Sequence, residues 1–497
     1  MPNKSDNLIV RPPVVAVMGH IDHGKSTLLD YIRKSNTTAG EVGGITQGIS
    51  AYEVVHNGKR ITFLDTPGHA AFISLRDRGA YIADIAILVV SAEDGVKPQT
   101  LEALQSIKTA KIPYIVAINK IDKENANVER TKQNLAENDI FVESYGGEIP
   151  AVPISAKTGQ GVPEILDMIA LVAEIGEFKA DPSVNASGIV LESERHKSKG
   201  VTATLVIKDG TLKTGMFVVA GESLSPIRIL QNFKGEAINE ASFSSPVRVI
   251  GFDIIPPAGT TFETYNNKKE AESAREENIT RRENQKNKPN KIPEEEKMIL
   301  PVTIKANNAG TIEAIEHEIA KISHERLAIK IISKGIGEIS EGDVKSAGGK
   351  EGSLILGFSV GSDASAKALA ERLGITIITF DIIYKLTEYL EALILEKAPK
   401  IEVEEKTGVA KVLKFFSRVK DKQVIGARAE EGVLSSNAEV RIMRREAEIG
   451  RGHIRELQRQ KMKVGTVEAV NEFGAMVESK IELAPGDKLE CFKIVQK

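Results

Sequence analysis

Apolar runs and amphipathic stretches alternate along the first 180 residues of the chain. Short runs that are almost wholly apolar predict buried parallel strands, as in RPPVVAVM, ITFL and PYIVAI. The stretches STLLDYIRKS (26–35) and PEILDMIALVAEI (163–175) have the length and spacing of helices. Strands that alternate with helices predict a doubly wound α/β domain, which we place at residues 11–180 after a short tail at residues 1–10.

The pattern changes three times after residue 180. Residues 181–265 contain short alternating runs separated by turn residues, which is typical of a small β-barrel. Residues 266–298 are almost wholly polar and predict a charged, solvated connector helix and a linker. Residues 299–380 return to alternating strands and helices and predict a second parallel-sheet α/β domain.

A long helix at residues 381–398 is predicted to connect this domain to a last β-rich region at residues 399–497. The turn Asp209-Gly210 before an apolar run resembles Glu431-Gly432, and PPAGTTF resembles APGDKLE. We therefore predict two β-barrels of one type, separated by the α/β domain. The fold class is a multidomain α/β plus β protein joined by connector helices.

Composition restricts where this protein acts and what it binds. The chain has 497 residues, of which 41% are apolar and 27% charged. It lacks a secretory signal pattern and an apolar run of the roughly 18–20 residues that span a membrane, so we expect a cytoplasmic protein. The single cysteine, Cys491, excludes an internal disulfide framework. The net charge of −3 lacks the basic excess of a nucleic-acid binder, so RNA contacts must come from local patches.

The stretch VMGHIDHGKSTLLDYI lies between a predicted strand and a predicted helix, and it fits the pattern G-x-x-x-x-G-K-[ST]. Gly19 and Gly24 allow backbone N–H groups to surround phosphates, and the helix N-terminus adds partial positive charge. Lys25 is predicted to reach the β- and γ-phosphates, and the Ser26 hydroxyl to bind Mg²⁺. The first domain is therefore predicted to be a P-loop nucleotide-binding domain.

Three further stretches at strand ends complete the predicted site. Asp65 is placed to hold Mg²⁺ through water, and Gly68 to offer its N–H group to a γ-phosphate. Asp122 has two carboxylate oxygens that complement the ring N–H and 2-amino groups of guanine, and Ser155-Ala156-Lys157 suits recognition of guanine O6. The predicted ligand is GTP, not ATP. The predicted GTP-binding residues are Gly19, His20, Ile21, Asp22, His23, Gly24, Lys25, Ser26, Thr27, Asp65, Thr66, Pro67, Gly68, His69, Asn119, Lys120, Asp122, Ser155, Ala156 and Lys157.

A glycine-rich stretch between the first helix and the Asp65 strand predicts a mobile switch loop. Its central residues are Gly44, Ile45, Thr46, Gln47 and Gly48. Thr46 is predicted to contact Mg²⁺ and the γ-phosphate and to order the loop when GTP is bound. An ordinary surface loop is the alternative interpretation.

The stretches GHIDHGKST, GGITQG, DTPGH, NKID and SAK resemble those of translational GTPases. That resemblance implies that His69, after DTPG, is the catalytic residue that orients the attacking water once the ribosome brings it into place. From residue 10 to the end, the domain order and the stretches LPVTIKANNAGTIEAI, GIGEISEGDV and FDIIYKL resemble bacterial translation initiation factor 2.

This resemblance implies a function and a set of partners. It implies a GTPase that stabilises initiator (formylmethionyl) tRNA on the small ribosomal subunit, promotes subunit joining and hydrolyses GTP on the ribosome. The expected ligands are GTP or GDP and Mg²⁺. The expected partners are both ribosomal subunits and initiator tRNA, with no membrane, and a monomer is expected.

The sequence departs from the family pattern at three places. We expect the long N-terminal extension common in the family to be missing, and with it any docking that the extension provides. Gly48 stands where a histidine often follows Ile-Thr-Gln. In the last barrel Phe473, between Glu472 and Gly474, replaces the family cysteine.

The candidate tRNA-binding residues of the last barrel are Arg441, Glu472, Phe473 and Gly474. The basic stretch 441–463 predicts an RNA contact, and a solvated charged hairpin is the alternative. For Phe473 the alternative is a residue of the barrel core.

Two other functions remain as alternatives. An elongation-type aminoacyl-tRNA carrier follows its first barrel directly with a second one, and the predicted α/β domain at residues 299–380 argues against it. A ribosome-assembly GTPase would bind ribosomal RNA without charged tRNA, so only the ligand of the last barrel distinguishes it.

Overall fold

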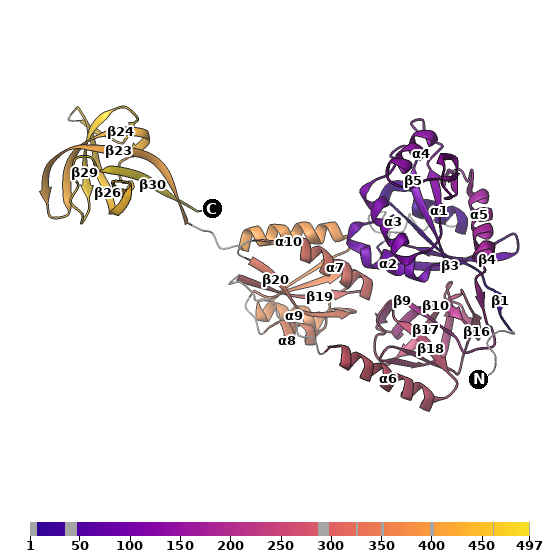
Figure 1. Ribbon diagram of the computed structural model, residues 1–497. Helices are drawn as coiled ribbons and strands as arrows, with labels where there is room; N and C mark the ends of the chain where they lie inside the picture. Colours follow the sequence, from indigo (N-terminus) through magenta and orange to yellow (C-terminus); the bar gives the residue numbers. More distant parts are fainter. Residues whose placement is uncertain are drawn as a thin grey trace. The chain divides into compact units, whose positions relative to one another are not determined.

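The computed structural model describes residues 7–34, 47–286, 298–324, 327–348, 352–397, 402–460 and 462–496. The chain divides into two compact units, residues 1–397 and residues 398–497 (Figure 1). Within the described ranges, every helix is too short or too polar to cross a membrane.

A six-stranded sheet organises the N-terminal α/β domain in the order β3-β4-β2-β5-β6-β7, and only β3 runs antiparallel to its neighbour. The strands are β2 (Val14–Gly19), β3 (Ser50–His56), β4 (Lys59–Asp65), β5 (Ile85–Ser91), β6 (Tyr114–Asn119) and β7 (Ala151–Pro153). The helices are η1 (Ile21–His23), α1 (Lys25–Arg33), η4 (Ala70–Phe72), α2 (Ile73–Ile82), α3 (Pro98–Ala110), α4 (Val128–Glu137), η5 (Glu143–Tyr145) and α5 (Val162–Ile175).

Helices cover both faces of this sheet, which explains why its central strands are continuous apolar runs. Every residue of β2 and of β5 is buried. Leu75 of α2 and Ile107 of α3 pack on one face, and Leu28 of α1 and Ile165 of α5 pack on the other. The predicted doubly wound α/β domain is confirmed, and the carboxyl ends of β2, β4 and β6 come together at one edge.

The following β-rich segment forms a barrel-like, eight-stranded sheet in the order β13-β12-β18-β9-β10-β17-β14-β15. Two further strand pairs, β1–β8 and β11–β16, lie beside it. The strands are β1 (Ile9–Val10), β8 (Lys179–Ala180), β9 (Ser187–His196), β10 (Gly200–Asp209), β11 (Thr211–Lys213), β12 (Phe217–Ala220), β13 (Ser223–Pro226), β14 (Ile229–Asn232), β15 (Ala237–Ile238), β16 (Glu240–Ser242), β17 (Pro246–Phe252) and β18 (Thr261–Tyr265).

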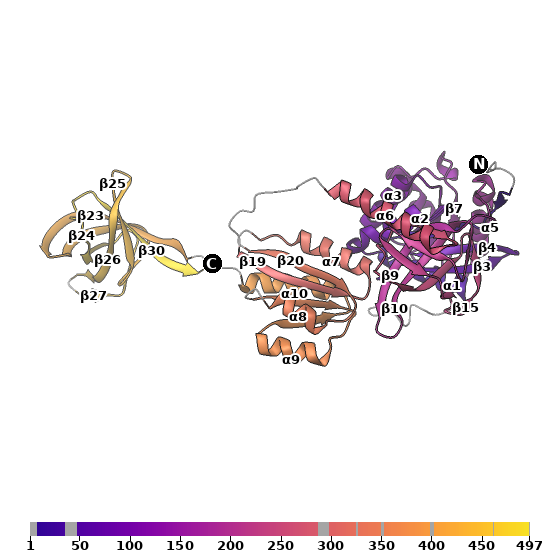
Figure 2. The ribbon, with the colours of Figure 1, turned by 90° about the horizontal axis from the view of Figure 1, so that it is seen from below.

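The polar connector helix is α6 (Lys268–Lys286). It lies along the first barrel (Figures 1 and 2), where Ala271 is fully buried against Val219 and Leu224. The expectation that this helix is solvated on all sides is therefore wrong for the face that carries Ala271. Ion pairs of Arg275 and Arg282 also join the helix to the barrel. A face with one small apolar residue and several polar contacts gives no apolar periodicity in the sequence.

The second α/β domain has a parallel sheet in the order β20-β19-β21-β22. Its elements are β19 (Met298–Ala306), α7 (Ala309–Lys321), β20 (Leu327–Ile336), α8 (Glu341–Ala347), β21 (Leu354–Phe358), α9 (Ala364–Leu373), β22 (Thr376–Phe380) and α10 (Ile383–Lys397). Helices α7 and α10 cover one face, and α8 and α9 cover the other (Figure 1). Leu386 and Leu390 of α10 are fully buried, so this helix also packs on the domain from which it leads.

The C-terminal unit is a closed barrel, because β23 pairs with both β30 and β24 in the order β23-β30-β25-β26-β29-β24. Its strands are β23 (Glu402–Val419), β24 (Lys422–Ser435), β25 (Glu439–Arg444), β26 (Ala447–Arg459), β27 (Met462–Val464), β28 (Thr466–Glu468), β29 (Glu472–Glu478) and β30 (Lys488–Gln496).

The repeated Gly turns of the two barrels share one conformation. Gly210 and Gly432 both have positive φ, at 77° and 66°. A Cβ atom would approach the carbonyl oxygen of Asn185 or Thr407 to 2.4 Å or 2.2 Å, so both turns require glycine.

Candidate functional site

The P-loop joins β2 to α1 and depends on two glycines. Gly19 has φ of 140°, and a Cβ atom there would lie 2.4 Å from the carbonyl oxygen of Val89. Gly24 has φ of 87°, and its Cβ would lie 2.4 Å from Nδ2 of Asn119. The loop therefore packs so closely on its neighbours at these two positions that only glycine fits.

Asn119 connects the P-loop to the loop that follows β7. Its Nδ2 donates to the carbonyl oxygen of His23 at 2.8 Å, and its Oδ1 accepts from the backbone N–H of Ala156 at 2.9 Å. The Ser155 hydroxyl donates to Asp122 Oδ1 at 2.6 Å and accepts from the N–H of Thr158 at 3.1 Å. The Ser155 hydroxyl also lowers the pKa of Asp122, which keeps this carboxylate ionised and fixed in direction.

Lys25 is 4% exposed, and its Nζ donates to the carbonyl oxygen of His20 at 2.7 Å. Burial lowers the pKa of Lys25 to about 8, and the nearby carboxylate of Asp65 opposes this shift. A Cβ atom on Gly68 would lie 2.5 Å from the same Nζ. The DTPG turn and the P-loop lysine therefore meet at one point, where a terminal phosphate would receive the cation and a backbone N–H group together.

Two residues predicted to contact the nucleotide hold the loops in place. His23 is fully buried, with Nδ1 3.3 Å from the carbonyl oxygen of Val89, and burial lowers its pKa to about 3. The Thr66 hydroxyl donates to the carbonyl oxygen of Val17 at 2.7 Å, which ties β4 to β2. Both side chains act within the protein, so we assign them to positioning the loops.

Oxygen donors suited to Mg²⁺ lie at the expected places. Ser26 is in the first turn of α1, and Asp65 is the last residue of β4, next to the P-loop strand. Hydroxyl and carboxylate oxygens are the donors that Mg²⁺ prefers. Thr46, Gly44 and Ile45 lie outside the described residues, so their predicted roles stay predictions.

The described end of the switch loop reaches the second α/β domain. Gln47 Nε2 donates to the carbonyl oxygen of Asp381 at 2.9 Å, between β22 and α10. Gly48 lies close to Glu192 of β9 and to Asn308 at the start of α7. This segment therefore contacts the second α/β domain directly and lies beside the first barrel.

His69 caps η4 and is 6% exposed. Its Nδ1 accepts a hydrogen bond from the backbone N–H of Ala71 at 2.8 Å, so in the neutral ring Nε2 carries the proton. Burial lowers the pKa of His69 to about 4, with a counteracting effect of Glu318. The ring lies edge-on to Tyr384 of α10, with 4.1 Å between ring centroids.

Two arginines of α2 have roles that the sequence analysis missed. Arg76 is buried and donates to the carbonyl oxygens of Gly68 and His69 and to the carboxylate of Glu102, so it fixes the DTPGH loop. Arg78 donates to both carboxylate oxygens of Glu313 in α7, at 2.8 and 3.0 Å. The sequence feature that could have indicated these roles is the pair of arginines, two residues apart, in a helix most of whose residues are buried.

Glu192 is a buried carboxyl group where the first barrel meets the switch segment. Burial raises its pKa to about 8, Glu194 adds to the effect, and Arg78 and Arg248 oppose it. Among the described residues, Oε1 of Glu192 has no hydrogen-bond partner. The folded protein therefore keeps a proton here that the unfolded chain releases near pH 4.5.

Glu192→Gln should remove a pH-dependent loss of stability. Between about pH 5 and pH 8 the unfolded parent binds fewer protons at this position, so its stability should fall by up to about 1.4 kcal/mol per pH unit. The variant has no proton to release and should show a shallower dependence. Thermal unfolding of both proteins at intervals from pH 5 to pH 8 measures this. Equal slopes would show that Glu192 ionises normally.

The C-terminal barrel has a hollow of about 530 Å³ at one end of β23, β24, β26 and β29. Glu472, Phe473 and Gly474 line it, as do Phe416 and Lys414. Phe473 is 5% exposed and belongs to the barrel core, whereas Phe416 is 60% exposed. Lys414 Nζ lies 5.6 Å from the centroid of the Phe416 ring. Phe416, which the sequence pattern does not single out, offers the more accessible aromatic face.

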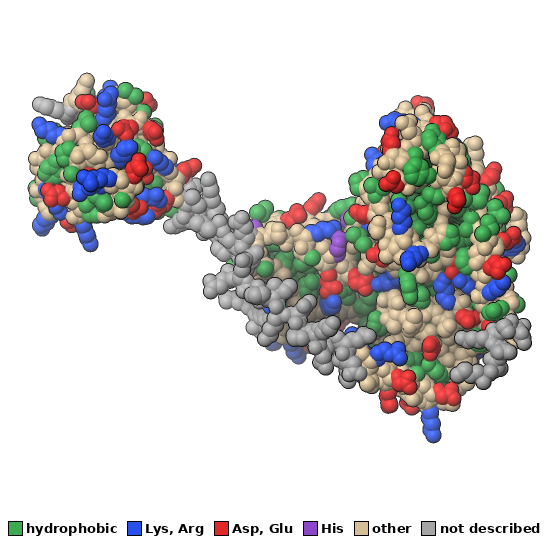
Figure 3. Space-filling view, in the orientation of Figure 1, with side chains coloured by type: hydrophobic (Ala, Val, Ile, Leu, Met, Phe, Trp, Pro, Cys, Tyr) green, Lys and Arg blue, Asp and Glu red, His purple; other side chains and the backbone are tan. Residues whose placement is uncertain are grey.

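Arg441 lies elsewhere on this barrel and does not line the hollow. It forms an ion pair with Glu404, and its guanidinium lies 5.3 Å from the ring centroid of Phe492. Other arginines of the basic stretch also pair with acids, and basic and acidic side chains are interspersed on the face seen in Figure 3. Counting charges along the sequence overstates the free positive charge, because the paired acids come from other strands.

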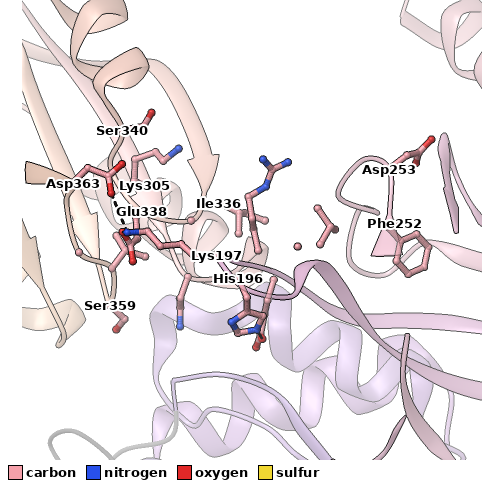
Figure 4. Close-up of a pocket in the computed structure, with 18 residues that line it drawn as sticks. His196, Lys197, Phe252, Asp253, Lys305, Ile336, Glu338, Ser340, Ser359 and Asp363 are labelled. Atoms are coloured by element: carbon pink, nitrogen blue, oxygen red, sulfur yellow. Dashed lines mark hydrogen bonds and ion pairs between the residues drawn. The ribbon is translucent and has the colours of Figure 1, made fainter. Parts of the chain in front are cut away.

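A larger hollow, of about 900 Å³, lies between the β9–β10 hairpin and the second α/β domain. Lys197 from the hairpin pairs with Glu338 and with Asp363, the latter at 3.0 Å (Figure 4). Lys305, which also lines the hollow, lies 3.2 Å from Asp343. Because the ion pairs of Lys197 join the hairpin to the second α/β domain, we interpret this hollow as a junction between domains.

The comparisons with known proteins agree with this architecture. The family profile described as "Elongation factor Tu GTP binding domain" matches residues 11–174, "Elongation factor G domain 2" matches residues 185–265, and "Translation-initiation factor 2" matches residues 273–391. The translation initiation factor IF-2 of Rubrobacter xylanophilus is 40% identical over 99% of this chain and 72% of its own length. The chain belongs to the translation initiation factor IF-2 family. The predicted resemblance is thereby confirmed, and the protein is a translational GTPase with a guanine-nucleotide site.

Other relatives carry the same description. IF-2 of Thermotoga petrophila is 42% identical over 99% of this chain and 72% of its own length. IF-2 of a Nitratiruptor species is 42% identical over 99% of this chain, which spans 60% of that relative's length.

The crystal structure of GDP-bound aIF5B from Aeropyrum pernix aligns with 97% of this chain and 92% of its own, with 24% identity and a TM-score of 0.49.

Proposed function

We propose that this member of the IF-2 family is a GTP-dependent initiation factor that stabilises initiator tRNA on the small ribosomal subunit, promotes subunit joining and hydrolyses GTP on the ribosome. The expected partners are both ribosomal subunits and initiator tRNA, and the expected setting is the cytoplasm, with the protein as a monomer. The order of GTPase domain, barrel, α/β domain and closed barrel in one chain supports this proposal. It disfavours an elongation-type carrier, which follows its first barrel with a second one.

The proposed binding and hydrolysis of GTP are supported by the loops at the carboxyl edge of the six-stranded sheet. GTP would bind with its phosphates on the P-loop and its base beside Asp122 and Ala156. Ser26 would hold Mg²⁺ directly and Asp65 through water, and the ion when bound neutralises charge on the β- and γ-phosphate oxygens. Lys25 would balance the remaining negative charge, and the N–H group of Gly68 would contact the γ-phosphate. His69 would orient the attacking water.

The hollow beside Phe416 in the C-terminal barrel is the main support for the proposed binding of initiator tRNA. An exposed aromatic ring with a lysine beside it suits a nucleotide base stacked on the ring and a phosphate near the cation. The buried Phe473 and the small Gly474 form the adjoining floor, where an aminoacyl group would fit. The Glu472 carboxylate at the rim is placed to accept hydrogen bonds.

Filter binding of charged and uncharged initiator tRNA to the GTP-loaded protein tests the proposal. We expect tighter binding of the charged form. Equal binding of both forms, together with binding to ribosomal RNA, would favour a ribosome-assembly GTPase.

Phe416→Ala should weaken binding of charged initiator tRNA by about 5- to 150-fold, because base stacking on an aromatic ring contributes about 1–3 kcal/mol. Thermal stability should change little, since the side chain is mostly exposed. Phe473→Ala is the matched comparison. It should also weaken tRNA binding, but it removes a core side chain and should cost about 3–5 kcal/mol of barrel stability. Binding titrations and thermal melts of both full-length variants measure these effects, and unchanged binding by a folded Phe416→Ala protein would exclude its ring from the site.

A further inference from the structure

The edge of the second α/β domain between β22 and α10 contacts two loops of the GTPase domain, the end of the switch loop and the DTPGH loop. Asp381 accepts a hydrogen bond through its carbonyl oxygen from Gln47 Nε2 at 2.9 Å. Three residues later, the Tyr384 ring lies edge-on to His69, with ring centroids 4.1 Å apart. One short stretch of chain, residues 381–384, therefore holds the end of the switch loop and the histidine after DTPG at the same time.

His69 is turned toward this second α/β domain. Its ring touches Tyr384 of α10 and Phe72 of η4, at centroid distances of 4.1 and 6.0 Å. The charges that act on the ring come from Glu318 and Lys321 of α7 and from Arg76 of α2. Nε2 is buried and has no hydrogen-bond partner among the described residues. The atom that would orient a water therefore lies beneath the second α/β domain.

The backbone around His69 is held firmly, so its side chain is the movable part. Arg76 donates to the carbonyl oxygens of Gly68 and His69, which fixes the loop on α2. The start of α7 packs closely on the same helix, since a Cβ atom on Gly310 would lie 2.4 Å from Leu75 Cδ2. A rotation of the His69 side chain toward the nucleotide needs the Tyr384 contact to break, while these other contacts stay in place.

We propose that Tyr384 is a positioning residue for GTP hydrolysis, whose ring retains His69 against the second α/β domain and so restrains hydrolysis in the free protein. Release of this contact, when a partner displaces the Tyr384 ring, would free His69 to turn toward the γ-phosphate. The inference rests on the proposed catalytic role of His69. Tyr384 is suited to such a role because it is 47% exposed, so a partner can reach its ring. The buried Leu386 and Leu390 meanwhile fix α10 to its own domain.

The test compares three full-length variants with the parent in the absence of ribosomes. Tyr384→Ala removes the ring, Tyr384→Phe keeps it, and Tyr389→Ala removes the ring that packs on Phe380 elsewhere on the same helix. Carbethoxylation of His69 by diethyl pyrocarbonate, quantified by mass spectrometry, reports whether its ring is covered. Single-turnover GTP hydrolysis reports its effect on the reaction.

Tyr384→Ala should increase both His69 modification and GTP hydrolysis by about 2- to 13-fold, the population change that the loss of one aromatic pair permits. Tyr384→Phe and Tyr389→Ala should remain within twofold of the parent. Adding His69→Ala to Tyr384→Ala should abolish the gain in hydrolysis.

Two outcomes would overturn the inference. One is a His69 that stays protected in Tyr384→Ala. The other is a His69 that becomes reactive without faster hydrolysis, although His69→Ala lowers ribosome-stimulated hydrolysis. If His69→Ala leaves ribosome-stimulated hydrolysis unchanged, the catalytic assignment itself fails, and the protection assay still shows separately whether Tyr384 covers the ring.

Discussion

His69→Ala should lower ribosome-stimulated GTP hydrolysis by about 10²–10⁴-fold and leave GTP affinity nearly unchanged. The proposed contacts to the bound nucleotide come from the P-loop, the backbone N–H group of Gly68, Asp122 and the loop after β7, whereas the His69 side chain is assigned to the attacking water. In the structure that ring faces Tyr384 and carries its proton on Nε2. Its contribution should therefore come when it orients the attacking water, which affects the transition state more than substrate binding.

Stopped-flow nucleotide binding and phosphate release with saturating ribosomes separate these effects. His69→Gln is the matched variant, because an amide also donates a hydrogen bond to water but is not aromatic, and we expect it to retain part of the activity. The backbone of the DTPGH loop should stay in place in both variants, since Arg76 holds it through carbonyl oxygens. Ribosomes that stimulate the alanine variant as strongly as the parent would exclude the proposed role.

The nucleotide site was predictable because each part of it is a short stretch that the fold places independently. A buried parallel strand is a continuous apolar run, and the residues that follow it must lie at the edge of the sheet. Gly19, Asp65 and Asn119 are the last residues of three strands of one sheet and lie at its same edge, as expected from the sequence. Their roles toward the nucleotide stay predictions. Local chemistry sets the ends of elements in the same independent way, as in the capping box of Ser340 and Asp343 at the start of α8 and the positive φ of Gly374 after α9.

Contacts between elements distant in the sequence were not predictable in the same way. Periodicity shows that a face is buried, but it does not show which element covers it. Arg78 pairs with Glu313 across 235 positions of the chain, and Gln47 reaches Asp381 across 334. For the same reason the ion pairs of Arg441 and Arg451 with Glu404 were missed, and with them the partial compensation of charge in the predicted basic patch.

Asp122→Asn should reduce GTP affinity by about 100-fold and shift the preference toward xanthosine triphosphate. The Asp122 carboxylate is held by the Ser155 hydroxyl at 2.6 Å, and this hydrogen bond lowers its pKa, so it is ionised at neutral pH. Its oxygens accept from the ring N–H and 2-amino groups of guanine, and charge-assisted bonds of this kind contribute about 1.5–3 kcal/mol each. The variant amide presents one donor, which repels the 2-amino group and suits the 2-oxo group of xanthine.

Competition binding of fluorescent GTP against GTP and xanthosine triphosphate measures this shift directly. Ser155→Ala is the control, since it removes the hydroxyl that orients Asp122 but keeps both acceptor oxygens. We expect it to weaken GTP binding only about 2- to 13-fold, the effect of a single hydrogen bond, without changing which base is preferred. The loops should stay connected in both variants, because Asn119 contacts His23 and Ala156 without involving Asp122. A folded Asp122→Asn protein that still prefers GTP would show that the base is recognised elsewhere.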